Sequence, residues 1–197
     1  MFINKTRFRQ AIKEAYNNND LQVGVPETWG GVYIKGIGWE IWMDQLPNWA
    51  KGALIKYIGD FPEAGEIHRY GKKMEGLWET AAWLGDEFLQ LLRNESKESC
   101  MITPLVYNRE GITVRFAQNK TTKKILMIVG RRCELLDLDQ MEEGEEVDGP
   151  REAAGTGMIY WENDHCVLGI CVQNTAQAGE KLRPLMQQLE KIDFQRI

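Results

Sequence analysis

Apolar residues recur at helical spacing in four segments of the chain. In the first segment, residues 6–17, one face of the expected helix carries Phe8, Ala11, Ile12, Ala15 and Tyr16. The second begins at Pro47, a residue that suits the first turn of a helix. The other two are residues 75–93 and residues 175–192, where Pro184 marks either a kink or the true first turn. The pattern predicts four amphipathic helices.

Apolar and polar residues alternate in most of the remaining chain, which is typical of strands. VYIKGIGWEIWMD, residues 32–44, contains two short runs joined through Gly36 and Gly38, and it predicts a hairpin. Short polar turns separate the later runs, as they do between antiparallel strands. Those later expected strands are residues 101–107, 112–118, 125–130, 133–138, 157–162 and 165–172.

These elements predict an α+β fold. We expect an antiparallel β meander of about five to seven strands, with amphipathic helices packed on one side and a C-terminal helix. A chain of 197 residues is long enough to bury its own core. Residues 1–73 contain only two short helices and a hairpin, which is a small core for an independent domain. We therefore expect them to pack on residues 74–197, so that residues 1–197 form a single domain.

Three tryptophans lie close together in GWEIWMDQLPNW, residues 38–49. We expect Trp49, on the helix after Pro47, to be buried against the hairpin. On a strand, Trp39 and Trp42 point to opposite faces of the sheet. Because one face of an antiparallel sheet is often solvated, we expect at most one of these two in the core. The other is a candidate aromatic contact for a protein partner; the alternative is an aromatic core.

Residues 59–73 are expected to form a loop, since they contain a proline and several glycines. The segment carries a basic group around Tyr70, made of His68, Arg69, Lys72 and Lys73. Such a group is a candidate contact for phosphate or for an acidic partner. The alternative is a solvated connection without a binding role.

Residues 134–152, which we call the acidic segment, contain nine acidic residues and one base, Arg151. The segment therefore carries a charge of −8, whereas the whole chain carries −5. It does not match a calcium-binding EF-hand loop, because a loop starting at Asp137 would have Met141 at a ligand position. We expect residues 140–152 to be mobile or held only at their ends. The candidate contacts for a basic partner are Asp137, Asp139, Glu142, Glu143, Glu145, Glu146 and Asp148; the alternative is charge that only aids solubility.

The four cysteines are expected to be free thiols. They show no CxxC spacing, and the N-terminus lacks the continuous apolar run of a signal peptide. We therefore predict a cytoplasmic protein without disulfides, in which at least Cys166 or Cys171 is buried. No apolar run is long enough to span a bilayer, so no membrane association is expected.

We expect no metal site and no cofactor. His165, Cys166 and Cys171 lie close in sequence, but on a strand His165 and Cys171 would stand about 20 Å apart at roughly 3.3 Å per residue. They could not close around one zinc ion. The chain also lacks a phosphate-binding glycine loop, a nucleophile elbow and a zinc-protease motif, and it has two histidines.

These observations favour a non-enzymatic protein-interaction or regulatory module. Such a module would be an inhibitor, or an accessory protein of the anti-defence or immunity type, that uses the acidic segment and an exposed aromatic patch to contact a partner with a basic surface. One alternative is a small-molecule carrier with an apolar pocket between the sheet and the C-terminal helix. A second is a nucleic-acid-binding protein, which the net charge of −5 disfavours. A third is an enzyme without a recognisable local motif.

Overall fold

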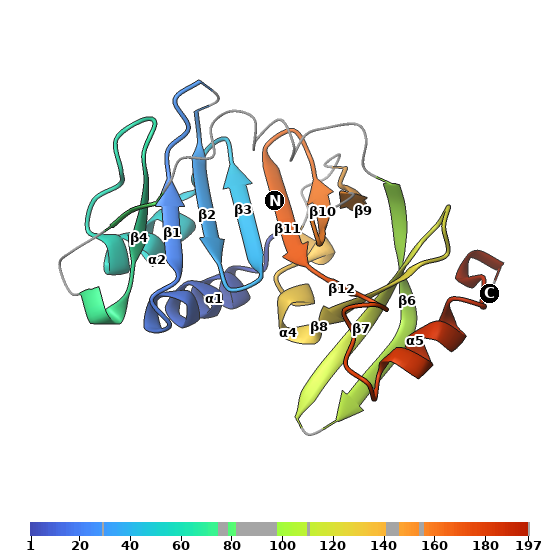
Figure 1. Cartoon of the computed structure of the whole chain (residues 1–197). Helices are drawn as coiled ribbons and strands as arrows, with labels where there is room; N and C mark the ends of the chain where they lie inside the picture. Colours follow the sequence, from blue (N-terminus) through green and yellow to red (C-terminus); the bar gives the residue numbers. More distant parts are fainter. Residues whose placement is uncertain are drawn as a thin grey trace.

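The computed structural model describes residues 1–28, 30–74, 79–81, 98–109, 111–140, 146–153 and 156–196. Within these ranges the α+β class is confirmed, and the strands form one antiparallel sheet (Figure 1). The twelve strands are β1 (Leu21–Gly24), β2 (Val32–Gly36), β3 (Trp39–Met43), β4 (Ile67–Tyr70), β5 (Glu79–Ala81), β6 (Glu98–Arg109), β7 (Ile112–Asn119), β8 (Ile125–Val129), β9 (Asp148–Ala153), β10 (Met158–Glu162), β11 (Cys166–Cys171) and β12 (Gln173–Asn174). Their order across the sheet is β12-β8-β7-β6-β9-β10-β11-β3-β2-β1-β4-β5.

The strand count exceeds the prediction because several short strands form where the sequence predicts other structure. The chain forms β4 within the expected loop of residues 59–73, and β9 within the acidic segment. Residues 79–81 form β5 against β4, so this part of the expected helix 75–93 is wrong; residues 75–78 and 82–93 lie outside the described residues. The expected strand 133–138 is also wrong. The short helix α4 (Gly130–Cys133) ends at the first residue of this range, and Leu136 makes only an isolated bridge to Ile3.

Two of the predicted helices form where they were expected. The first, α1 (Lys5–Asn17), is capped by Asn4, whose Oδ1 accepts hydrogen bonds from the backbone N–H groups of Thr6 and Arg7 at 3.1 and 3.0 Å. The second, α2 (Asn48–Ile58), begins directly after Pro47. Both helices lie beside β1–β3 (Figure 1). Trp49 is half-buried and packs edge-on against the ring of Phe8, with ring centroids 5.2 Å apart, so it contacts α1.

The hairpin of β2 and β3 is confirmed, but every residue of β3 is buried. Trp39 and Trp42 do point to opposite faces, since Trp39 belongs to the main core and Trp42 to a second buried cluster. The expectation that at most one of them is core is therefore wrong. The face that carries Trp42 is also buried, because it holds a cluster with Tyr33, Ile67, Tyr160 and Val167.

The strands β6 to β12, in the C-terminal half of the chain, close into a ring. The ladder runs from β8 through β7, β6, β9 and β10 to β11, and β12 returns to pair with β8. Only Val172 separates β11 from β12, so the chain itself completes the circle. Alternate residues of these strands point into the ring and join the main core, among them Ala117, Ile128, Trp161 and Leu168. The core is therefore continuous from α1 to the interior of the ring.

The C-terminal helix α5 (Arg183–Leu189) packs on the outside of the ring, beside β7 and β8 (Figure 1). Pro184 lies in its first turn, so the helix is shorter than the expected residues 175–192. The buried Met186 and Leu189 pack in one cluster with Phe116 and Met127. These strand residues point away from the main core, so the helices do not all pack on one side of the sheet.

The pairing of β3 with β11 joins the two halves of the chain. It extends from Trp39 opposite Ile170 to Met43 opposite Cys166. The single domain stays a prediction; the ladder is consistent with it, because separating residues 1–73 would expose one edge of β11 and part of the main core. No helix in the described ranges is both long and apolar enough to cross a membrane.

We expect the fragments 1–73 and 74–197 not to fold independently. Each would lose the β3–β11 ladder and would expose apolar residues that the other fragment covers. Amide hydrogen exchange of the separate fragments should show little protection in β3 and β11, and mixing the fragments should restore it. Strong protection of both strands in the isolated fragments would contradict the single domain.

The predictions about the cysteines are confirmed. All four are free thiols; Cys100 and Cys166 are buried, and Cys133 and Cys171 are half-buried. Burial raises the pKa of Cys100 to about 12 and that of Cys133 to about 11. Since the thiolate is the reactive form, both groups are poor nucleophiles near neutral pH.

Alkylation with iodoacetamide at pH 7.5 should therefore modify Cys171 first. Cys100, Cys133 and Cys166 should react about tenfold more slowly or less, because they are buried or carry a raised pKa. Peptide mass spectrometry along a time course gives the four rates, with the urea-unfolded chain as control. Four equal, fast rates in native buffer would show that this packing is wrong.

Candidate functional site

The beginning of the acidic segment is held firmly to the N-terminus. The backbone N–H of Asn4 donates to the carbonyl of Leu135 at 2.8 Å, and that of Asp137 donates to the carbonyl of Phe2 at 2.7 Å. The side-chain amide of Asn4 also donates to the carboxylate of Asp137 at 3.2 Å. Leu135 is buried in the main core. The segment therefore leaves the body of the protein from a fixed base.

Directly after this base the segment presents an apolar residue to solvent. Leu138, in the 3-10 helix η2 (Leu138–Gln140), is 53% exposed, and Asp137 and Asp139 flank it. The pattern of acidic residues alone did not identify Leu138, because the sequence predicts a strand that ends there. Of the other candidate contacts, Glu146 and Asp148 are exposed, and Asp148 pairs with Arg151. Glu142, Glu143 and Glu145 lie outside the described residues.

The end of the acidic segment is part of the sheet. Residues 148–152 belong to β9, so the stretch 140–152, expected to be mobile or held only at its ends, is held in the sheet at its C-terminal end. Glu152 is buried; it accepts a hydrogen bond from Lys124 Nζ at 2.6 Å and another from Asn119 Nδ2 at 3.0 Å. These bonds fasten β9 to the end of β7 and the start of β8. Glu152 has a structural role, and the candidate contact surface ends before it.

The structure places neither tryptophan candidate on an exposed patch. Trp39 is 4% and Trp42 is 3% exposed, and the indole N–H of Trp42 donates to the carbonyl of Gly30 at 3.2 Å. Both indoles stabilise the core, one on each face of β3. Their burial removes them as contacts for a partner, and among the described residues of the acidic segment Leu138 is the large apolar residue that is exposed.

The predicted basic group is divided between surface and interior. His68 and Tyr70 are buried in β4, where His68 Nε2 lies 2.8 Å from the Glu66 carboxylate and Nδ1 lies 3.3 Å from the Tyr70 hydroxyl. Arg69 is half-buried and points to the other face. Only Lys72 and Lys73 are exposed, in the 3-10 helix η1 (Lys72–Met74). The four residues do not form one basic surface.

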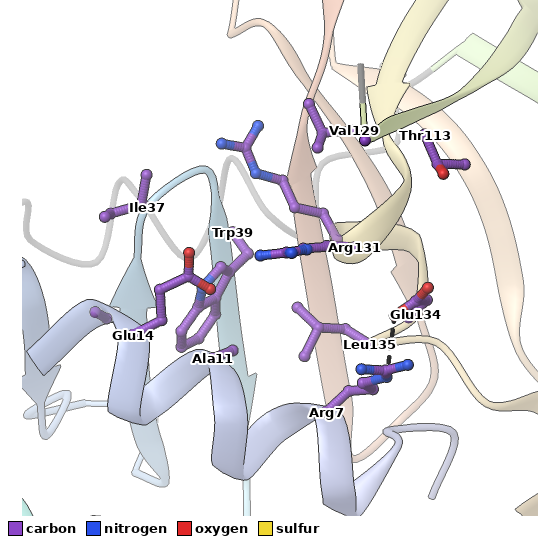
Figure 2. A pocket seen from close by; sticks show the side chains of 13 residues that line it. Arg7, Ala11, Glu14, Ile37, Trp39, Thr113, Val129, Arg131, Glu134 and Leu135 are labelled. Atoms are coloured by element: carbon purple, nitrogen blue, oxygen red, sulfur yellow. Dashed lines mark ion pairs between the residues drawn. The ribbon is translucent and has the colours of Figure 1, made fainter. Parts of the chain in front are cut away.

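A cleft of about 590 Å³ lies between α1, the tip of the β2–β3 hairpin and α4; we call it the α1–α4 cleft. Residues that line it include Arg7, Glu14, Trp39, Arg131, Arg132 and Leu135. Figure 2 shows Ala11 and Glu14 on one side, Arg131 and Leu135 on the other, and Trp39 between them. At its rim, Arg7 Nε and the Glu134 carboxylate form an ion pair at 3.0 Å. This cleft is not at the place expected for a carrier, since α5 packs directly on the sheet.

A buried carboxyl group lies on the second face of the sheet. Glu40 of β3 is 4% exposed, and its two oxygens accept hydrogen bonds from the hydroxyls of Tyr33 and Tyr160, each at 2.9 Å. Burial raises the pKa of Glu40, an effect that the two hydrogen bonds oppose in part. Burial also raises the pKa of both tyrosines, so they remain hydroxyl donors. The two hydrogen bonds of Glu40 therefore link β3 to Tyr33 of β2 and to Tyr160 of β10.

Gly169 of β11 makes this arrangement possible. It lies opposite Glu40 in the ladder, between Glu40 and Tyr160. A Cβ atom on this residue would lie 2.6 Å from Cε1 of Tyr160 and 2.9 Å from Cγ of Glu40. Only glycine therefore lets the tyrosine ring cross β11 to reach the carboxyl group. A glycine inside an expected strand is a sequence signal that another group approaches the backbone closely at that position.

No protein-family model, no curated protein and no solved structure matches this chain. The function is therefore inferred from its own residues.

Replacing Glu40 with glutamine should change the pH dependence of stability. Folding raises the pKa of Glu40 above its usual 4.5, so protonated Glu40 contributes to the stability of the folded state. This contribution is fully present below pH 4.5 and is lost as the pH rises through the pKa of Glu40 in the folded state. Glu40→Gln keeps a neutral acceptor at all pH values. Urea unfolding should therefore show the variant gaining stability relative to wild type between pH 5 and pH 8.

Glu27→Gln is the matched control, since Glu27 is exposed. It should leave the difference between pH 5 and pH 8 as it is in wild type. If the stability of Glu40→Gln and of wild type depends on pH in the same way, the pKa of Glu40 is not raised in the folded state.

Proposed function

We propose that the protein is a non-enzymatic interaction module of the cytoplasm that regulates or inhibits a protein partner with a basic surface. The acidic segment is the contact, and an inhibitor or an accessory protein of the anti-defence or immunity type fits this mode of action. The observation that supports the proposal is Leu138, exposed between Asp137 and Asp139 on a base fixed by hydrogen bonds to Phe2 and Asn4.

An exposed apolar side chain flanked by two carboxylates matches the usual arrangement of a protein interface. The centre of such an interface is apolar and its rim is polar. Leu138 supplies the exposed apolar contact for which the sequence suggested Trp39 or Trp42. The carboxylates around it favour a positively charged partner and disfavour an acidic one, because like charges repel.

The fixed base also lowers the cost of binding. Backbone that is already ordered in the free protein loses little conformational freedom when a partner docks. The hydrogen bonds at Leu135 and Asp137 order the residues next to Leu138 before any partner arrives. The charged groups then act mainly on the rate of association, which long-range attraction increases.

Neutralising the acidic segment should slow partner binding without unfolding the protein. The test variant carries Glu142→Gln, Glu143→Gln, Glu145→Gln and Glu146→Gln. The control makes the same change of charge at exposed positions elsewhere, with Glu27→Gln, Asp60→Asn, Glu63→Gln and Glu180→Gln. A partner captured by the wild type from the source cell should be lost with the test variant and kept with the control. The thermal midpoints should agree within a few degrees.

The rates of binding to the purified partner separate charge from apolar contact. At low salt the test variant should associate about tenfold more slowly than wild type, and the difference should shrink as salt screens the charges. Leu138→Ser should instead speed dissociation, as loss of a packed contact does. A test variant that associates as fast as wild type at low salt would refute the role of the acidic segment.

A further inference from the structure

We propose that the α1–α4 cleft is a binding site for a small organic anion, in which Arg131 and Arg132 hold a phosphate or carboxylate group and Ile37 contacts its apolar body. The cleft volume of about 590 Å³ lies in the usual range of small-ligand sites, roughly 300–1,000 Å³. The proposal does not depend on the acidic segment binding a partner.

The charge of the cleft is the first argument. Of the charged groups that line it, Arg7 is neutralised by Glu134 at 3.0 Å. Among the described residues, neither Arg131 nor Arg132 forms an ion pair or a hydrogen bond through its guanidinium group. Two arginines from neighbouring positions therefore line one cleft without an ion-pair partner among the described residues, while Glu14 lines the same cleft. Guanidinium groups bind phosphate and carboxylate through paired N–H donors, so an oxyanion is the natural ligand.

The position of Arg132 is the second argument, because the fold holds this side chain in place. Arg132 is half-buried, and its guanidinium group lies against Gly38 at the turn of the β2–β3 hairpin. A Cβ atom on Gly38 would overlap Cζ of Arg132, and the positive φ of Gly38 also favours glycine at this turn. Packing against the hairpin backbone limits the conformations of this long side chain, which lowers the cost of ordering it around a ligand.

The remaining walls indicate what kind of molecule carries the anion. Ile37, at the hairpin tip, is 41% exposed and supplies apolar surface, whereas Trp39 and Leu135 line the cleft but are buried. Glu14 faces the cleft from α1, opposite Arg131 (Figure 2). Its carboxylate repels a second negative charge and accepts hydrogen bonds. The site therefore suits a compact molecule with an anion at one end and an apolar or hydrogen-bond-donating body, and it disfavours a polyanion such as nucleic acid.

The test uses phenyl phosphate and benzoate as probes, which share an aromatic body and differ in the anion. Inorganic phosphate supplies the anion alone, and benzyl alcohol supplies the body alone. Amide shifts of residues 37–39 and 130–135, followed by NMR titration, report binding at the cleft. At least one of the two aromatic anions should bind about tenfold more tightly than either partial probe, and the preferred one identifies the anion.

Arg131→Gln and Arg132→Gln should each weaken binding of the preferred probe by about tenfold or more, because each removes a charge-assisted contact. Arg9→Gln removes an exposed arginine of α1 that does not line the cleft, and it should leave binding unchanged. The quadruple glutamine variant of the acidic segment should bind the probe as wild type does, which separates this proposal from the interaction function.

The proposal is overturned if neither aromatic anion shifts these amides at millimolar concentration. It is also overturned if the doubly substituted Arg131→Gln/Arg132→Gln chain, shown by circular dichroism to be folded, binds the preferred probe as tightly as wild type.

Discussion

The antiparallel ladder between β3 and β11 is the interaction on which the rest of this structure depends. It joins a strand from the N-terminal hairpin to a strand of the C-terminal ring, more than 120 residues further along the chain. Its inner residues, Ile41 and Leu168 among them, belong to one core that extends from α1 into the ring. Its outer face holds Glu40 opposite Gly169. Because Gly169 has no side chain, the aromatic side chain of Tyr160 can cross β11 at this position. Both faces of the central strands are thus buried, which explains why neither Trp39 nor Trp42 is left for a partner.

The charges of the protein are distributed by this architecture. Lys123 pairs with Asp193, which follows α5, and Lys124 pairs with Glu152 of β9, so these two ion pairs fasten the C-terminal segment and β9 to the ring. Glu152 belongs to the acidic segment by sequence and to the sheet by structure. The two surfaces for which we propose a binding role are the first part of the acidic segment, with the exposed Leu138, and the arginines of the α1–α4 cleft. These two surfaces meet at Glu134 and Leu135, which line the cleft and begin the acidic segment.

The local pattern of the sequence was sufficient for the elements whose own residues determine them. The first helix has an apolar face and an Asn cap, the second follows a proline, and the hairpins of β2–β3 and β10–β11 alternate in polarity around short turns. The four free cysteines followed from their spacing. The strands β4, β5 and β9 were missed, because their sequences resemble a loop, a helix and an acidic tail. Each becomes a strand by pairing with a neighbour that supplies the hydrogen bonds.

The sequence by itself therefore determined the α+β class, the main hairpins, the opposite orientations of Trp39 and Trp42, and the concentration of negative charge in residues 134–152. Only the tertiary structure decided that both tryptophans are buried, that His68 points inward and that Leu138 is exposed. It alone brought Arg131 and Arg132 to Trp39 and Glu14, which lie about a hundred residues earlier in the chain. The physical reason is that side-chain alternation and turn chemistry act over a few residues. Which strand covers which face depends on contacts between distant segments, and a local pattern does not contain them.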